Sequence, residues 1–294
     1  MISNCVICNS QKLEPYKKNS QRKDILKCNE CYLTFVNPTK VTTSSSRYKD
    51  GSFWESTNYN IKKMIQSDFT DEEGIHFANN FKSMYSYCNE FLINGKNILE
   101  IGAGTGVHLI MLDKIGFTVT GIEPDSQNSQ LINDKLINGR CYTGNFQDIK
   151  FNTKFDIIWL YHVVEHISQP DELLEYCYEN LHDDGILIIA VPDCDNPESL
   201  IDSISNHDHL FHFSKNSLKI LARNSNYKIE KCDSMSSIKE LNKQRLNRFL
   251  KKGNLNFLNK KIWPYYPLKI TDKNDGYEIR MILRKLQKKV VKKR

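Results

Sequence analysis

Short apolar runs alternate along the chain with amphipathic stretches, a pattern typical of strands that are connected by helices. The runs at 117–122 and 155–160 are rich in β-branched and aromatic residues, which predicts strands. The run at 185–192 is continuously apolar, so it predicts a strand covered on both faces, as in a parallel sheet. Residues 74–93 carry apolar side chains at helical spacing and predict a core helix ahead of a strand at 97–99. The pattern predicts an α/β fold with helices on both faces of its sheet.

Two more strands are expected after a helix that begins near Ser214 or Asn216, and they lie at 227–230 and 276–283. The segment between them, roughly 235–271, is basic and contains several aromatic residues. It is predicted to be an insertion that covers a substrate. A peripheral helical decoration is the alternative.

A glycine-rich turn follows the strand at 97–99. Its sequence is Glu100-Ile101-Gly102-Ala103-Gly104-Thr105-Gly106, and a helix is expected from Val107. Glycines at alternate positions keep the turn free of side chains, so a ligand can lie against bare backbone near the positive end of a helix. Glu100 offers an acceptor or a counter-charge for a cationic group. One alternative is the dinucleotide-binding fingerprint G-x-G-x-x-G, but the third glycine here comes one residue too early for it. The other alternative is a glycine turn in an unrelated α/β protein.

The pattern E-x-G-x-G-x-G resembles the first motif of class I methyltransferases that use S-adenosylmethionine. This resemblance implies a Rossmann-like seven-stranded sheet whose last two strands form an antiparallel pair at the edge. Glu123 ends the strand at 117–122, a position at which nucleotide-binding α/β folds hold ribose hydroxyls, and Ser126 is a candidate N-cap for the next helix. The loop at 144–149 is implied to hold the adenine ring. The expected cofactor-binding residues are Glu100, Gly102, Ala103, Gly104, Gly106, Glu123, Pro124, Phe146, Gln147, Asp148 and Tyr161.

The strand at 155–160 runs into a segment, 161–170, that resembles the "vleHl…P" segment of small-molecule methyltransferases. His166 is the candidate general base, because an imidazole titrates near neutral pH. Glu165 is the second candidate catalytic residue, either orienting His166 or binding substrate. A packing role for His166 is the alternative, and the lesser candidates for the base are His162, His209 and His212. A metal site at the histidines of 207–212 lacks a matching carboxylate or thiolate pattern.

Two C-x-x-C pairs stand near the N-terminus, and nineteen residues separate them. Cys5, Cys8, Cys28 and Cys31 have the spacing of a four-thiolate zinc ribbon, so a structural Zn²⁺ is expected. Two disulfides or free thiols are the alternatives, and the absence of a secretory segment disfavours disulfides. The other five cysteines occur in apolar contexts and are predicted to be small core residues.

A four-cysteine module followed by an aromatic linker and a methyltransferase core resembles bacterial sugar and glycan methyltransferases. The likeness includes the four cysteines, the segment at 32–38 and Glu165-His166. It implies a sugar, nucleotide-sugar or surface-glycan acceptor that is methylated on oxygen or carbon, with nitrogen left open. An RNA methyltransferase that uses its ribbon and basic tail is the first alternative. A cofactor-binding scaffold without turnover is the second.

The chain has 294 residues, which suits one large domain and one small module. The predicted organisation is a zinc ribbon at 1–41, a linker and helical segment at 42–96, and a methyltransferase domain at 97–294. The formal net charge of +6 is concentrated in a basic tail at 284–294, predicted to be a solvated end, with attraction to a phosphate-bearing partner as the alternative. No apolar run is long enough to span a bilayer and no signal segment is visible, so cytoplasmic residence is expected.

Overall fold

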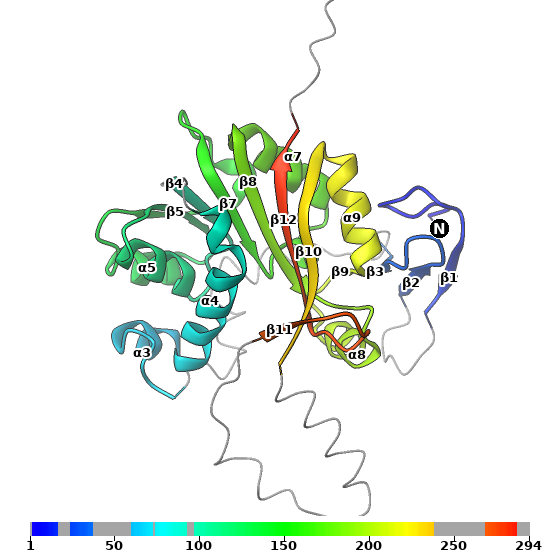
Figure 1. Cartoon of the computed structure of the whole chain (residues 1–294), viewed down its shortest axis with the longest axis horizontal. Coiled ribbons are helices and arrows are strands. Elements are labelled where there is room, and N and C mark those ends of the chain that lie inside the picture. The colour runs from blue at the N-terminus through cyan, green and yellow to red at the C-terminus, as the bar shows by residue number, and fades with distance from the viewer. Residues whose placement is uncertain are drawn as a thin grey trace, which may run out of the picture.

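A central sheet organises the chain in the computed structural model (Figure 1). The residues described are 2–16, 24–37, 60–72, 74–92, 97–237 and 268–286. The strands of this sheet are β4 (Asn97–Ile101), β5 (Thr118–Glu123), β6 (Arg140–Thr143), β7 (Phe155–Tyr161), β8 (Leu181–Pro192), β10 (Tyr227–Ser237), β11 (Leu268–Thr271) and β12 (Glu278–Lys285). Their order is β11-β10-β12-β8-β7-β4-β5-β6. The predicted α/β fold is therefore confirmed.

Strands β4 to β8 are parallel, while β12 runs antiparallel between β8 and β10. The expected antiparallel pair at the edge is thus present. The sheet has eight strands rather than seven, because β11 pairs with the end of β10. β11 and the last residues of β10 are the two ends of the predicted insertion, and its residues 238–267 lie outside the described part of the chain.

Two apolar layers cover the sheet, because successive strand residues point to opposite faces. Ile98, Ile157 and Ile188 pack with one layer, and Leu99 and Ile158 pack with the other. The first layer is formed by α3 (Ile61–Gln66), α4 (Gly74–Cys88), α5 (Val107–Lys114) and α6 (Ser126–Asn133), with η2 (Asn89–Phe91) after α4. The second contains α7 (Pro170–Asn180) and α9 (Lys215–Asn224). The remaining helices are η3 (Phe146–Asp148), η4 (Val164–His166) and α8 (Pro197–Ser205).

The helix starts mostly follow the sequence signals. Ser214 caps α9 and shares a capping box with Ser217. The cap of α6 is Asp125 rather than the predicted Ser126, since the Asp125 carboxylate accepts from the backbone N–H groups of Gln127 and Asn128. The carboxylate also suits the positive end of the helix.

The N-terminal cysteine module shares a second sheet with the core. Strands β1 (Leu13–Pro15), β2 (Ile25–Cys28), β3 (Thr34–Val36) and β9 (Phe211–His212) pair antiparallel in the order β1-β2-β3-β9. The hydroxyl of Ser214 donates to the Cys31 carbonyl, and Leu33 and Phe35 are buried in the same apolar cluster as α9. The module is therefore packed onto the larger domain, which Figure 1 shows beside α9. Of the predicted linker and helical segment at 42–96, residues 42–59 lie outside the described residues.

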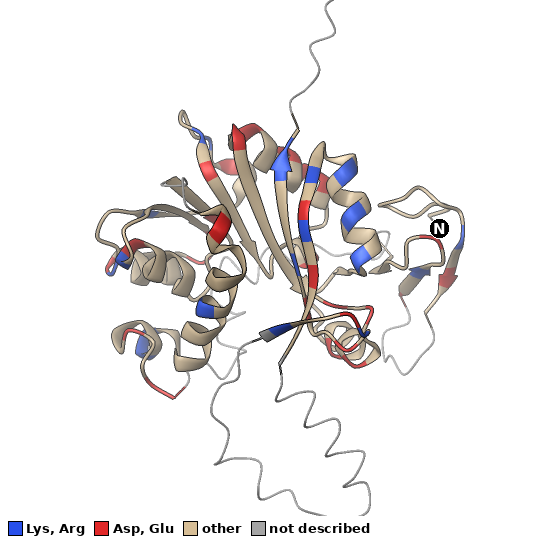
Figure 2. Cartoon of the chain, in the orientation of Figure 1, with Lys and Arg blue, Asp and Glu red and all other residues tan. Residues whose placement is uncertain are grey.

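Charged residues occur on the helices, in the connecting segments and along β10 (Figure 2). Lys215, Lys219 and Arg223 follow one another at four-residue spacing along α9, so they share one side of that helix. The basic tail beyond residue 286 lies outside the described residues. Within the described ranges, we find no helix with the length and apolar character needed to cross a bilayer.

Candidate active site

A cavity of about 770 Å³ opens at the carboxyl ends of β4, β5 and β7, where ligands bind in doubly wound sheets. All the predicted cofactor-binding residues line it except Gly106. Of the two predicted catalytic residues, His166 lines the cavity and Glu165 does not. The structure therefore brings together predicted residues from four separate segments, 100–104, 123–124, 146–148 and 161–166.

The glycine turn requires glycine for two different reasons. Gly102, Gly104 and Gly106 all have φ between 56° and 73°, the left-handed region in which side chains cause strain. A Cβ on Gly106 would overlap the side chain of Ile132 in α6, so this glycine serves helix packing and lies away from the ligand cavity. A Cβ on Gly102 would come within 2.7 Å of Val163 Cγ2. Gly104 leaves its backbone on the cavity wall.

Glu100 is fully buried at the end of β4 and lines the cavity. Its Oε1 lies 2.9 Å from His108 Nδ1, whereas no described group bonds Oε2. Burial raises the pKa of Glu100, although the contact with His108 opposes that rise. An unpartnered buried carboxylate oxygen in a cavity suits a ligand with a cationic nitrogen.

Glu123 bridges the glycine turn and the start of α6. Its Oε2 accepts the backbone N–H of Gly104 at 2.7 Å, and its Oε1 accepts that of Asp125 at 3.0 Å. Burial raises the pKa of Glu123 to about 8 despite these two donors. Each oxygen keeps further lone-pair capacity, so the carboxylate can still accept the hydroxyls of a ribose.

The predicted adenine loop forms η3 at the cavity rim. Phe146 is buried with its ring 5.4 Å from that of Tyr176, while Gln147 and Asp148 are exposed at the rim. Asn145 Nδ2 donates to Asp148 Oδ2, which fixes the loop locally. The loop thus offers an apolar surface and polar groups to the same part of the cavity.

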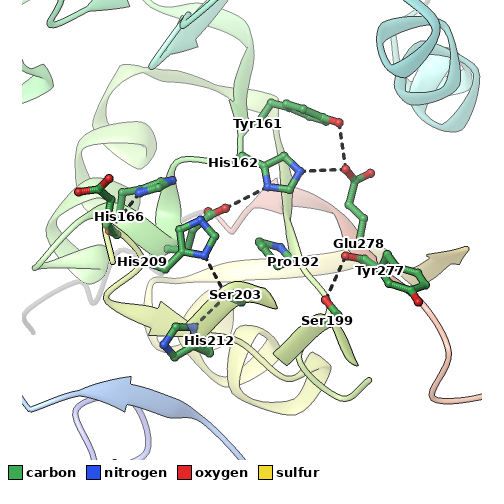
Figure 3. Close-up of polar contacts among 12 residues, drawn as sticks. Tyr161, His162, His166, Pro192, Ser199, Ser203, His209, His212, Tyr277 and Glu278 are labelled. Atoms are coloured by element: carbon green, nitrogen blue, oxygen red, sulfur yellow. Dashed lines mark hydrogen bonds and ion pairs between the residues drawn. The ribbon is translucent and has the colours of Figure 1, made fainter. Parts of the chain in front are cut away.

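A network of charges adjoins the cavity, and it is buried except for the partly exposed ring of His162 (Figure 3). The ring of His162 donates to Glu165 Oε1 and to Glu278 Oε2, both at 3.0 Å. Arg280 donates to the other oxygen of Glu278, Oε1. Burial alone would lower the pKa of His162, but the two carboxylates raise it to about 10. Burial alone would likewise raise the carboxyl pKa values, yet their cationic partners hold Glu165 and Glu278 at about 2. The two carboxylates therefore favour the imidazolium form of His162, which makes this ring a poor proton acceptor.

This network contains residues that the sequence analysis missed. Glu278 and Arg280 come from β12, and Tyr161 also donates to Glu278 Oε2 at 3.0 Å. The available signal was two charged residues at positions i and i+2 of an otherwise apolar strand, since such residues share one face of the sheet. Arg280 is completely buried and donates to Ser83 of α4 as well.

Two histidines stand together above the network. His166 Nδ1 lies 3.1 Å from the Asp208 carbonyl, and the ring of His209 packs edge-on against His166 at 4.6 Å. Both rings line the cavity. Glu165, His166 and His209 each offer one ligand-type atom within 4.8 Å of the others, a carboxylate and two imidazoles that are also suited to a divalent cation. His209 therefore lies on the cavity wall beside His166, although the sequence made it only a lesser candidate for the general base.

The four N-terminal cysteines form the predicted cluster. Their sulfur atoms all lie within 4.8 Å of one another, with Cys5 to Cys31 and Cys8 to Cys28 both at 3.6 Å. All nine cysteines of the chain are described and none forms a disulfide. A tetrahedral Zn²⁺ with Zn–S bonds of about 2.3 Å requires S–S separations of about 3.8 Å, so the donor set and its spacing fit this ion.

Each C-x-x-C pair is followed by a residue in the left-handed conformation. These residues are Asn9, with a φ of 58°, and Tyr32, with a φ of 63°. The resulting tight turns direct both sulfurs of a pair to one side. The hydrogen bond between Cys31 and Cys5 lowers the pKa of the Cys5 thiol and raises that of Cys31, so without a metal the two sulfurs share one proton.

The fold is a Rossmann-like domain with a cavity at the carboxyl ends of its parallel strands, the place where such folds bind their ligands. A sequence profile described as a methyltransferase domain matches residues 77–231, which is more than half of the chain. The chain therefore belongs to the methyltransferase domain family.

The chain is also similar to a curated relative and to solved structures. The chain is 30% identical over 104 residues to the ubiquinone biosynthesis O-methyltransferase of Bradyrhizobium diazoefficiens, a match that covers 33% of this chain and 40% of that relative. A SAM-dependent methyltransferase from Archaeoglobus fulgidus has a TM-score of 0.53 and 16% identity over 71% of this chain and 94% of its own. The plantazolicin methyltransferase BpumL, solved with a desmethylPZN analog and SAH, has a TM-score of 0.53 and 17% identity over 83% and 97%. At these identities the solved structures show the fold.

Proposed function

We propose that the protein is an S-adenosylmethionine-dependent methyltransferase that acts on a small molecule. The observation that carries this proposal is one cavity that is lined by the glycine turn, by Glu123 and by His166. Family membership supports the reaction class. S-adenosylmethionine supplies a methyl group that its sulfonium centre activates.

The described residues fit this cofactor. Glu100 Oε2 is the partner we assign to its ammonium group, because that oxygen is buried and has no other described partner. Glu123 is assigned to the ribose hydroxyls, and Phe146, Gln147 and Asp148 to the adenine. Gly102, Ala103 and Gly104 contribute bare backbone, and Pro124 and Tyr161 complete the wall.

His166 is the general base of this proposal. The Asp208 carbonyl can only accept, so the Nδ1 atom of His166 carries a proton and its Nε2 keeps a lone pair. That nitrogen is assigned to take the proton of an acceptor hydroxyl. Glu165 is a positioning residue, because it holds His162 and places a carboxylate close to His166 without lining the cavity itself.

A sugar-containing acceptor methylated on oxygen or carbon is our proposal for the substrate class. The resemblance of the cysteine module and of Glu165-His166 to sugar methyltransferases supports it. Polar side chains at the cavity, among them His76, Asn80 and Asn206, suit an acceptor with several hydroxyl groups. The zinc ribbon, the linker and the methyltransferase domain keep the predicted boundaries in this proposal, with a structural Zn²⁺ held by Cys5, Cys8, Cys28 and Cys31.

The test combines binding with turnover. Purified protein is expected to bind S-adenosylhomocysteine in a calorimeter. It is also expected to transfer radiolabelled methyl groups from S-adenosylmethionine to members of a panel of sugar nucleotides and free sugars. His166→Gln should lower turnover by roughly 10²- to 10⁴-fold and leave that affinity unchanged. His182→Gln, at an exposed position of β8, is the matched control.

Each of the other outcomes has a clear consequence. Absence of S-adenosylhomocysteine binding would overturn the proposed function. Methyl transfer to RNA and to no sugar would show that the acceptor is RNA rather than a sugar-containing molecule. Binding without turnover of any acceptor would favour a scaffold, and full turnover by His166→Gln would remove His166 as the base.

A further inference from the structure

A buried pair of ionisable side chains flanks the glycine turn. Glu100 stands two residues before Gly102, and His108, the second residue of α5, stands two residues after Gly106. Glu100 Oε1 lies 2.9 Å from His108 Nδ1, and both side chains are almost completely buried and line the cavity. The sequence analysis gave His108 no role. Its contact with the residue assigned to the ammonium group makes it a candidate for a further residue of the cofactor site.

Aromatic residues surround the ring of His108. Its centroid lies 5.9 Å from that of Phe81 in α4 and 5.5 Å from that of Trp159 in β7, and Tyr161 packs edge-on against it at 4.5 Å. Glu100 is the hydrogen-bond partner recorded for this ring, and the Nε2 atom has none among the described residues. The polar contact of His108 is therefore directed to Glu100.

This contact determines how the carboxyl group of Glu100 can meet a ligand. A carboxylate can only accept hydrogen bonds, so the Nδ1 atom of His108 carries a proton and donates to Oε1. Oε2 is then the oxygen without a partner in the described chain. The contact also opposes the rise that burial causes in the pKa of Glu100. Without His108, burial would favour the neutral carboxyl group, which is a weaker partner for an ammonium ion than a carboxylate.

The ammonium group distinguishes S-adenosylmethionine from other adenosine compounds. Glu123 is assigned to the ribose and the loop at 146–148 to the adenine, and every adenosine compound contains these two parts. The group assigned to Glu100 belongs to the amino-acid end, which ATP and methylthioadenosine lack. A hydrogen bond between charged groups contributes roughly 10- to 100-fold in affinity. The state of Glu100 therefore decides how strongly the cavity selects for the amino-acid end.

We propose that His108 is a positioning residue that fixes the Glu100 carboxylate so that Oε2 is available to the ammonium group of the cofactor. The pair then selects ligands with a charged amino-acid end over other adenosine compounds. This proposal rests on the proposed function, because it concerns the binding of S-adenosylmethionine. Leu109 and Leu112 of α5 are buried in the same apolar layer as Trp159, so the packing of this helix holds His108 against Glu100.

The experiment compares two ligands that differ in one group. S-adenosylhomocysteine and its deaminated analogue, in which hydrogen replaces the amino group, are titrated separately into the full-length protein in a calorimeter. The wild type is expected to bind S-adenosylhomocysteine roughly 10- to 100-fold more tightly than the analogue. His108→Phe replaces the imidazole by an apolar ring, so it should lower this preference about tenfold and leave the affinity for the analogue unchanged.

Two amide variants separate positioning from folding. His108→Asn places an N–H donor near the position of Nδ1 and should retain most of the preference. His108→Gln places its amide near the position of Nε2 instead and should lose the preference. The two amides are similar in polarity, so a general effect on folding would change both variants alike. His182→Phe, at an exposed position of β8, is the control and should change neither affinity.

A double variant identifies the group through which His108 acts. Glu100→Gln should lose the preference by itself, and the addition of His108→Phe should lower it no further. An undiminished preference in His108→Phe or in Glu100→Gln overturns the proposal, as do equal preferences in His108→Asn and His108→Gln. Failure of the proposed function appears separately, as absent binding of S-adenosylhomocysteine to the wild type.

Discussion

Two groups of residues at the cavity are built from the chain in different ways. We call them the cofactor end, around the glycine turn and Glu123, and the acceptor end, around His166 and His209. The cofactor end depends on residues 100–123, in which one strand, one turn and the next strand end supply the glycines and both glutamates. The acceptor end assembles His166 of η4, His209 of the loop before β9 and His162, which Glu278 of the distant strand β12 holds in place from outside the cavity. Local geometry therefore determines the first end, and long-range packing determines the second. Damage to distant elements should reach the acceptor end and spare the cofactor end.

The largest effect is expected from loss of the proposed zinc. Structural zinc can contribute on the order of 10 kcal/mol to the folding of a small cysteine module. Cys28→Ser removes one ligand and should release β3 from β9, where Phe35 pairs with Phe211. Hydrogen exchange is expected to rise in β3 and β9 and to stay unchanged in β4 and β5. S-adenosylhomocysteine affinity should be retained.

Cys232→Ser, a cysteine of β10 outside the cluster, is the control for that experiment and should change neither region. Metal analysis of the wild type should give one zinc per chain. Unchanged exchange at β9 in Cys28→Ser would show that the module does not support the acceptor end.

The next effect concerns the buried charge network. Arg280→Met leaves Glu278 and Glu165 with His162 as their main cation, and breaking such a network is expected to cost about 3–5 kcal/mol in the free energy of unfolding. Urea denaturation measures this loss. Arg284→Met, on the same strand, removes a partly exposed contact with Glu230 and should cost less than about 1 kcal/mol. Equal losses in the two variants would contradict the role of the network.

The cofactor end is tested by a single glycine. Gly104→Val puts a β-branched residue at a φ of 56° and a side chain on the cavity wall, so S-adenosylhomocysteine affinity should fall about a hundredfold or more. Gly116→Val is the matched control, because its φ is also positive, at 95°, while nothing lies within 4 Å of its new Cβ. It should lose stability and keep its affinity. Undiminished affinity in Gly104→Val would show that the cofactor does not bind at this turn.

The same contrast explains what the sequence could predict. The glycine turn, Glu123 and the C-x-x-C pairs are local signals, because the residues that act together lie close in the sequence and their spacing reflects backbone geometry. Their clustering around one cavity and one set of sulfurs is present in the structure. The strand pattern likewise predicted the sheet, because buried parallel strands need continuous apolar runs.

The acceptor end was less predictable for physical reasons. Glu278 and Arg280 act through pairing of β12 with β8, a contact between segments far apart in the chain. The β3–β9 pairing involves a strand of only two residues, which is too short to show periodicity. Glu165 was expected at the reacting centre, but its side chain turns to His162 beneath the cavity. Spacing alone cannot show which way a side chain turns.

The smallest effect, and the finest test of the cofactor end, is the pH dependence of binding. Because the pKa of Glu123 is raised to about 8, the free protein holds this carboxyl protonated near neutral pH. Ribose hydroxyls donate to the carboxylate, so binding favours the ionised form and affinity should rise with pH, about eightfold between pH 6.5 and 7.5. The pKa of Glu100 is also raised, so its ionisation likewise increases affinity as the pH rises. The effect of Glu123 is therefore the difference between the pH profiles of the wild type and of Glu123→Gln. Calorimetry with S-adenosylhomocysteine should show a steeper rise in the wild type. Parallel pH profiles would mean that Glu123 does not meet the ribose as a carboxylate.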